Sequence, residues 1–130
     1  RSRRQRQMCI RDSHEGASLV LEQAKKLSEN LPIIVTGDFN AVPSDEPIQV
    51  LTNPSDPRHL THSRTIAGFI YGPEWTFHDF GKIPYDKREW IDYIFVKGNI
   101  KVLRHGVLTE TLNNLFPSDH CPVISTLILE

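Results

Sequence analysis

Trp90-Ile-Asp-Tyr-Ile-Phe-Val96 is the stretch that most clearly predicts an element of structure. It is rich in aromatic and β-branched residues, which favour strands, and it holds one carboxylate, Asp92, among apolar neighbours. Lys97-Gly98-Asn99 then reads as a turn, and a second apolar run extends from Ile100 to about Leu108. The pattern predicts a β-hairpin made of these two strands, with His105 facing solvent.

Elements on both sides of this stretch extend the prediction. Apolar residues at helical spacing predict an amphipathic helix over about residues 15–29, which Pro32 ends. Short apolar runs predict three more strands: Ile33-Ile34-Val35, buried on both faces and broken by Gly37; Trp75 to Phe80; and a buried strand from Pro122 to Leu129. One helix followed by several strands predicts α/β layering, and 130 residues suffice for a single domain.

The first 13 residues differ from the rest of the chain. They hold five arginines and one acid, Asp12, without amphipathic periodicity, so we expect residues 1–13 to be non-native or disordered. A basic arm for nucleic acid is the alternative. The two cysteines, Cys9 and Cys121, form no disulfide framework. No apolar run is long enough to cross a bilayer, and nothing in the sequence indicates a compartment or an oligomeric state.

Three short clusters place reactive polar groups at the ends or in the middle of apolar runs: Gly37-Asp38-Phe39-Asn40, Trp90-Ile91-Asp92-Tyr93 and Pro117-Ser118-Asp119-His120. Polar groups at strand ends in layered α/β folds converge on one crevice. Carboxylates supply the oxygen ligands that Mg²⁺ prefers, and a histidine beside a carboxylate transfers protons near neutral pH. An asparagine amide donates to a phosphate oxygen without adding charge. Together these groups fit the needs of phosphoester hydrolysis.

In this order, and with the contexts Ile91-Asp-Tyr-Ile-Phe95 and Ser118-Asp-His-Cys-Pro-Val123, the clusters resemble those of the endonuclease/exonuclease/phosphatase superfamily over about residues 14–130. The resemblance implies a DNase I-like fold, here a partial four-layer α/β sandwich truncated at its N-terminal half. In the family that half supplies an asparagine and a glutamate that binds the metal, and no segment here matches them. We therefore expect this chain alone to bind metal weakly and to have little or no activity.

The resemblance also implies roles for individual residues. Asp38 matches the aspartate that positions or activates the attacking water, and Asn40 the asparagine that contacts the scissile phosphate and holds that aspartate. Asp92 matches the buried carboxylate that orients the catalytic histidine, which His120 matches. Asp119 matches the aspartate beside the divalent metal, Mg²⁺ or Mn²⁺.

One more segment, Trp75-Thr-Phe-His-Asp-Phe80, is similar to a part of bacterial members that lies toward the substrate. On that resemblance His78 is expected to contact the substrate. His59, His62 and His105 show no ligand spacing, so we expect none of them to bind metal.

The expected function is metal-dependent hydrolysis of a small or lipid phosphoester, with water attacking in line. A nuclease is the alternative, and nucleic acid is the less favoured partner because residues 14–130 hold 10 basic and 15 acidic side chains. A non-catalytic binding module that retains the fold is the third possibility. For the residues themselves, Asp38-Phe39-Asn40 could be a loop that caps the following element, and His120 could be a satisfied core histidine.

Overall fold

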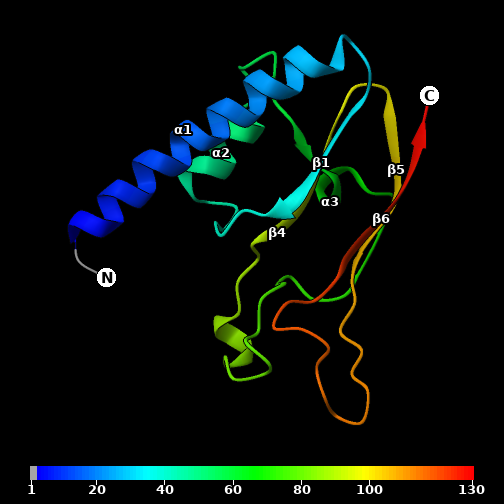
Figure 1. The fold of residues 1–130 in the computed structure, drawn as a ribbon. Helices are drawn as coiled ribbons and strands as arrows, with labels where there is room; N and C mark the ends of the chain where they lie inside the picture. Colours follow the sequence, from blue (N-terminus) through cyan, green and yellow to red (C-terminus); the bar gives the residue numbers. More distant parts are fainter. Residues whose placement is uncertain (1–2) are drawn as a thin grey trace.

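The computed structural model describes residues 3–130 of the chain, and side chains from residue 14 onward. The elements follow in the order α1 (Arg3–Ser28), β1 (Ile33–Asp38), α2 (Glu46–Thr52), β2 (Thr61–His62), α3 (Ser63–Ile66), β3 (Phe69–Tyr71), η1 (Tyr85–Lys87), β4 (Asp92–Lys97), β5 (Ile100–Val107) and β6 (Val123–Leu129). The strands form two three-stranded sheets, ordered β1-β4-β2 and β3-β5-β6 (Figure 1). The predicted α/β class is confirmed.

The amphipathic helix α1 ends where the sequence indicated. Ala17 and Leu21 on its apolar face are buried in the core, and α1 packs against α2. Glu29 and Asn30 have positive φ angles, a conformation that asparagine tolerates and that commonly ends a helix. The prediction for residues 1–13, which include Cys9, lies outside the residues whose side chains are described, and it stays a prediction.

The strand β1 lies antiparallel to β4, with Ile33 opposite Lys97 and Asp38 opposite Asp92. Two expectations about β1 were wrong. The strand continues past Gly37 to Asp38, and it is not buried on both faces, since Ile34 is 47% exposed. The reason is that only one face of β1 packs on the core, to which α1 and α2 contribute side chains. The other face of β1 is open.

The predicted hairpin of β4 and β5 was also wrong, because the two strands lie in different sheets. β1 and β2 occupy the two edges of β4, whereas β3 and β6 pair with β5. Gly98, at a φ of 97°, takes the chain from one sheet to the other. His105 on β5 is therefore fully buried and does not face solvent as predicted.

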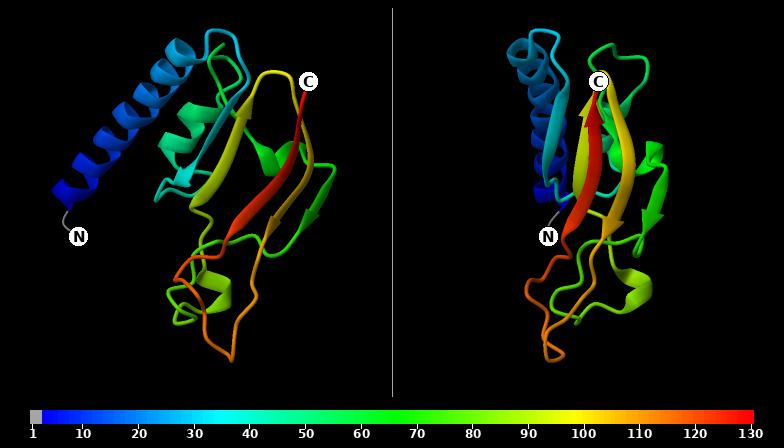
Figure 2. Two further views of the ribbon diagram at one scale, coloured as in Figure 1. Left: turned by 45° about the vertical axis from the view of Figure 1, so that its right-hand side comes forward. Right: turned by 90° about the vertical axis from the view of Figure 1, so that its right-hand side faces the viewer.

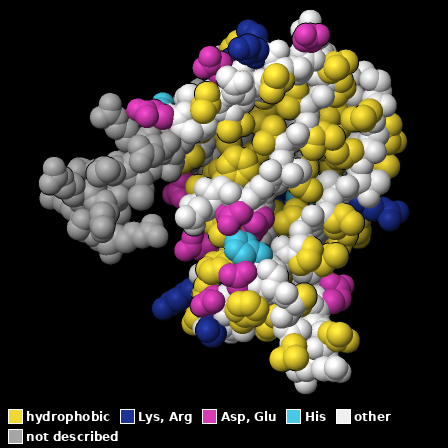
Figure 3. Space-filling view, in the orientation of Figure 1, with side chains coloured by type: hydrophobic (Ala, Val, Ile, Leu, Met, Phe, Trp, Pro, Cys, Tyr) yellow, Lys and Arg dark blue, Asp and Glu magenta, His cyan; other side chains and the backbone are white. Residues whose placement is uncertain are grey.

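The C-terminal strand β6 pairs antiparallel with β5, close to its predicted bounds. It is not buried on both faces, because half-buried residues alternate with the exposed Ile124 and Ile128. Hydrophobic side chains cover a broad area of the face that Figure 3 shows. The predicted strand from Trp75 to Phe80 is reduced to isolated bridges that join Phe77 to Glu89 and to His120.

The loops of residues 72–91 and 108–122 project from the end of the sheets opposite the C-terminus, and they lie together in every view (Figures 1 and 2). The ring of His78 in the first loop packs against that of Phe116 in the second, tilted by 42° and with ring centroids 4.4 Å apart. These loops carry the predicted site residues His78, Asp119 and His120 toward the ends of β1 and β4. Among the described residues, no helix has the length and apolar character needed to span a bilayer.

Candidate active site

Asp38 and Asp92 meet because of the register between β1 and β4. They are the last residue of β1 and the first of β4, and their Cα atoms are partners in the antiparallel pair. Side chains at directly opposite positions point to the same face of a sheet. Two carboxylates that are 54 positions apart in the sequence are thus placed side by side at the end of the open face.

His120 lies between these two carboxylates. Its Nδ1 is 2.8 Å from Asp92 Oδ2, and its Nε2 is 3.8 Å from Asp38 Oδ2. The side chains of Asp92, His120 and Asp38 are 19%, 26% and 48% exposed, so the group passes from a shielded acid to a solvent-facing one. Figure 3 shows a histidine among acidic side chains on this face. Asp92 is half-buried, and its hydrogen bond to His120 offsets the cost of removing a carboxylate from water.

The acids around His120 decide the direction of its pKa shift. Partial burial lowers the pKa, but the hydrogen bond and charge of Asp92 oppose this, as do the charges of Asp38 and Asp119. The net result is a pKa of His120 above its usual value. The three carboxylates therefore stabilise the imidazolium form by more than burial destabilises it.

Asn40 approaches the site through its backbone. Its N–H donates to Asp38 Oδ1 over 2.8 Å, and its φ of 49° turns the chain sharply after β1. The loop that follows β1 is anchored by the buried hydroxyl of Tyr93. This hydroxyl lies 2.8 Å from the carbonyl oxygen of Ala41 and 3.2 Å from that of Trp90. Burial raises the pKa of Tyr93 above its usual value, which keeps this hydroxyl a donor.

Asp119 and His78 lie beside this group and do not belong to it. The hydroxyl of Ser118 donates to Asp119 Oδ1 and accepts the N–H of His120, and the carbonyl of Asp119 accepts the N–H groups of His78 and Asp79. The side chain of His78 is buried, and its Nδ1 accepts the N–H of Gly81. Burial and the nearby charge of Arg88 lower the pKa of His78. Its predicted contact with a substrate stays a prediction.

Thr76 belongs to the site geometry, and the sequence reading did not single it out. It is fully buried, and its Oγ1 accepts the N–H groups of Ile91 and Asp92 over 3.0 and 3.2 Å. The available signal was a threonine between two aromatic residues in a segment whose histidine drew attention instead. A hydroxyl in such an apolar run needs a hydrogen-bond partner, and here the partner is the backbone of the site.

Three described side chains are arranged so that they could hold a metal ion: Asp38, Asp92 and His120 each offer one ligand atom, and these atoms lie within 4.8 Å of one another. Two carboxylates facing one imidazole suit a hard divalent cation, which binds oxygen ligands. Asp92 and His120 already use their facing atoms on each other, so Asp38 is the more available of the two carboxylates. Asp119, the predicted ligand, is outside this group, and its assignment stays a prediction.

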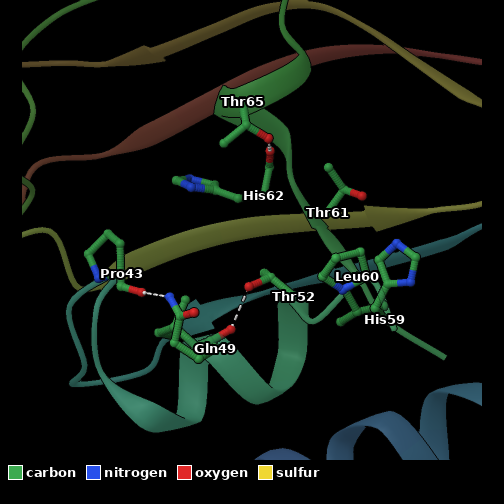
Figure 4. A pocket seen from close by; sticks show the side chains of 10 residues that line it. Pro43, Gln49, Thr52, His59, Leu60, Thr61, His62 and Thr65 are labelled. Atoms are coloured by element: carbon green, nitrogen blue, oxygen red, sulfur yellow. Dashed lines mark hydrogen bonds between the residues drawn. The ribbon is translucent and has the colours of Figure 1, made fainter. Parts of the chain in front are cut away.

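A pocket of about 340 Å³ lies elsewhere, between α2 and the segment of β2 and α3 (Figure 4). Its polar side chains are largely used within their own segments. The amide of Gln49 donates to the carbonyl of Pro43, and the hydroxyls of Thr52 and Thr65 donate to backbone carbonyls. None of the predicted site residues lines this pocket. The candidate active site is therefore the acid–histidine group formed by Asp38, Asp92 and His120.

The comparisons with known proteins agree on one family. A family model described as the endonuclease/exonuclease/phosphatase family matches residues 10–120. An endonuclease/exonuclease/phosphatase from Bacteroides vulgatus is 30% identical over 91% of this chain, with a TM-score of 0.83. An endonuclease/exonuclease/phosphatase family protein from Bacteroides thetaiotaomicron is 32% identical over 91% of the chain, with a TM-score of 0.80.

A third solved structure, a mannosyl-6-phosphatase from Bacteroides thetaiotaomicron, is 32% identical over 89% of this chain, with a TM-score of 0.77. No match is found among the curated proteins. The chain spans less than half of each of the three structures, with 44%, 46% and 45% of their lengths covered.

Proposed function

The chain belongs to the endonuclease/exonuclease/phosphatase family, and on this premise we propose that it carries the histidine side of a metal-dependent phosphoester hydrolase. The observation that supports the proposal is the position of His120, with Asp92 2.8 Å from one ring nitrogen and Asp38 3.8 Å from the other. A histidine with a carboxylate on each side is arranged for proton transfer and charge stabilisation.

The proposed reaction is in-line attack of water on phosphorus, with cleavage of the bond between phosphorus and the ester oxygen. The ester oxygen leaves as an alkoxide and takes a proton from solvent, and Asp38 afterwards returns its proton to solvent. Asp38, half exposed at the rim, positions the water and takes up its proton. Asp92 holds the Nδ1–H of His120, which leaves the Nε2–H for a phosphoryl oxygen. Because the pKa of His120 is raised, this N–H carries positive charge over a wider pH range. The amide of Asn40 would add a neutral donor to the same phosphate.

A divalent cation, Mg²⁺ or Mn²⁺, would be held by Asp119, as the family resemblance implies, and would offset the negative charge of the phosphoryl group. Asp38, Asp92 and His120, whose ligand atoms lie within 4.8 Å of one another, support a cation site at this end of the sheet. The expected substrate is a small or lipid phosphoester. The excess of acidic over basic residues after residue 13 supports it, and so does the structural match to a mannosyl-6-phosphatase.

The test uses the full-length protein with p-nitrophenyl phosphate, bis-p-nitrophenyl phosphate and duplex DNA, each with Mg²⁺, with Mn²⁺ and with EDTA. We expect hydrolysis of at least one small ester that EDTA abolishes. His120→Ala should lower kcat by about 10²- to 10⁴-fold, the usual contribution of general acid–base catalysis. His59→Ala is the control, because His59 contacts the carbonyl of Asp56 and lies outside the site.

Two outcomes would contradict the proposal. Preference for DNA, with activity that falls steeply as salt increases, would favour a nuclease. Unchanged activity in His120→Ala, or no hydrolysis of any of the esters, would favour a binding module that keeps the fold.

A further inference from the structure

Thr76 connects the two segments that carry Asp92 and His120. Its Oγ1 accepts the N–H groups of Ile91 and Asp92 over 3.0 and 3.2 Å. On the other side, its carbonyl oxygen accepts the N–H of Cys121, the residue after His120, over 2.7 Å. Thr76, which is fully buried, is therefore bonded to the backbone of Asp92 and to the backbone of Cys121, the residue after His120.

The hydroxyl of Thr76 takes the place of a strand neighbour that β4 lacks at this point. On the side of β4 away from β1 the neighbour is β2, which has two residues and pairs with Val96 and Phe95, at the far end from Asp92. Between Trp75 and Phe80 the chain makes only isolated bridges. Without the hydroxyl, the N–H groups of the buried Ile91 and the half-buried Asp92 would lose this acceptor, and leaving them unpaired is costly enough to move the backbone.

The position of this backbone sets the contact on which the site depends. Asp92 is the first residue of β4, so its carboxylate moves with the main chain that Thr76 holds. The 2.8 Å hydrogen bond to His120 Nδ1 determines which way the imidazole faces. Displacements of about 1 Å in such a contact are enough to lower rates by about 100-fold.

We propose that Thr76 is a positioning residue that, through its buried hydroxyl, holds the Asp92 carboxylate in register with the His120 imidazole. The catalytic part of this inference rests on the proposed function, and the geometric part does not. Thr76 touches no substrate. It acts through Asp92, and the hydroxyl rather than the methyl group is the part that matters.

The experiment compares Thr76→Ser and Thr76→Val in the full-length protein. Valine keeps the shape and removes the acceptor, whereas serine keeps the acceptor and removes the methyl group. We expect Thr76→Val to lower kcat by about 10- to 100-fold with KM changed by less than about threefold. Thr76→Ser should stay within about threefold of the wild-type kcat. The control is Thr52→Val, since that hydroxyl bonds to the carbonyl of Ile48 inside α2.

A second readout needs no substrate. The proton that His120 Nδ1 shares with Asp92 gives a downfield imidazole N–H resonance, which should persist in Thr76→Ser and in Thr52→Val. It should shift or disappear in Thr76→Val, while the circular dichroism spectrum stays native. If no phosphoester is hydrolysed, the proposed function fails, and this signal still tests whether Thr76 positions the pair.

The inference is overturned if Thr76→Val keeps both the resonance and a kcat within about threefold of wild type. It is also overturned if Thr76→Ser loses as much as Thr76→Val, because the methyl group would then be responsible. Should Thr76→Val not fold, Thr76→Cys replaces it, since a thiol is a weak acceptor of similar size. An unchanged resonance in that variant likewise overturns the inference.

Discussion

Two histidine groups in this chain differ in what surrounds the imidazole. His120 lies at the rim of the open face between Asp38 and Asp92. His105 and His62 form the second group, in which the rings are 5.6 Å apart and pack against Trp90. Here His105 Nδ1 contacts the hydroxyls of Ser63 at 2.9 Å and Ser125 at 2.8 Å.

The pKa values of the two groups shift in opposite directions. Burial lowers the pKa of His62 and His105 to about 4, with added repulsion from Arg64 and, for His62, from His105. Burial also acts on His120, but the neighbouring carboxylates outweigh it and raise the pKa. A hydroxyl bonds equally well to the neutral ring, whereas a carboxylate favours the charged one. The two groups therefore differ both in burial and in neighbouring charge: His105 is fully buried beside hydroxyls, whereas His120 is partly exposed between carboxylates.

The largest expected effect comes from removing the acid and keeping its shape. Asp92→Asn should lower the pKa of His120 and lower kcat of the full-length protein by about 10²- to 10⁴-fold, since the imidazole loses its charged partner. Rate measurements across pH, with an NMR titration of His120, provide the check. Asp56→Asn is the control, because Asp56 pairs with Arg58 on the surface. A pKa of His120 that stays raised in Asp92→Asn would contradict the comparison.

The second prediction concerns stability at low pH. The folded-state pKa values of His62 and His105 lie below the unfolded value of 6.5, so the unfolded chain binds more protons between about pH 6.5 and pH 4. The free energy of unfolding should therefore decrease as pH falls through this range, by up to roughly 3 kcal/mol for each histidine. The raised pKa of His120 acts in the opposite sense, because its stabilising contribution is complete below pH 6.5 and is lost as pH rises through its folded-state pKa.

Urea unfolding between pH 7 and pH 4 measures this dependence. In His105→Gln, which keeps a polar side chain but does not titrate, the decrease should be shallower. An identical decrease in the wild type and the variant would show that His105 does not contribute.

The third prediction concerns the addition of a carboxylate beside His105, which would give this histidine the kind of neighbour that His120 has. Ser125→Asp places a carboxylate beside His105 Nδ1, and it should raise the pKa of His105 by about 1 to 3 units from its low value. NMR titration of the ring measures the shift. Thr126→Asp is the matched control, because Thr126 lies on the exposed face of the same strand. Equal shifts in the two variants would mean that the local contact is not the cause.

The smallest expected effect comes from Ser125→Ala. This change removes one of the two hydroxyls that contact His105 Nδ1 and leaves that of Ser63. The free energy of unfolding should fall by about 1 kcal/mol, with the pKa of His105 still low, since no charge is added or removed. Urea unfolding at pH 7 detects the first part, and a loss well above this value would indicate that the two hydroxyls act together.

Much of the fold and of the candidate site was visible in the sequence, because those parts depend on local pattern. The helix end near Asn30, the strand that begins at Asp92 and the C-terminal strand lie close to their predicted bounds. The hairpin of β4 and β5 was wrong, since a Gly-containing turn also allows the chain to change sheets. His105 was misplaced with it, because a residue's exposure depends on what its sheet packs against.

The sequence by itself determined the residue types that can do chemistry, their order and the family to which the chain belongs. The tertiary structure decided which of them meet. The register of β1 and β4 sets Asp38 beside Asp92, and the loop after Phe116 brings His120 between them. It also made Thr76 a partner of Asp92 and placed the hydroxyls of two serines beside His105. Composition and periodicity act over a few residues, whereas a pKa or a hydrogen bond depends on neighbours that are distant in the chain.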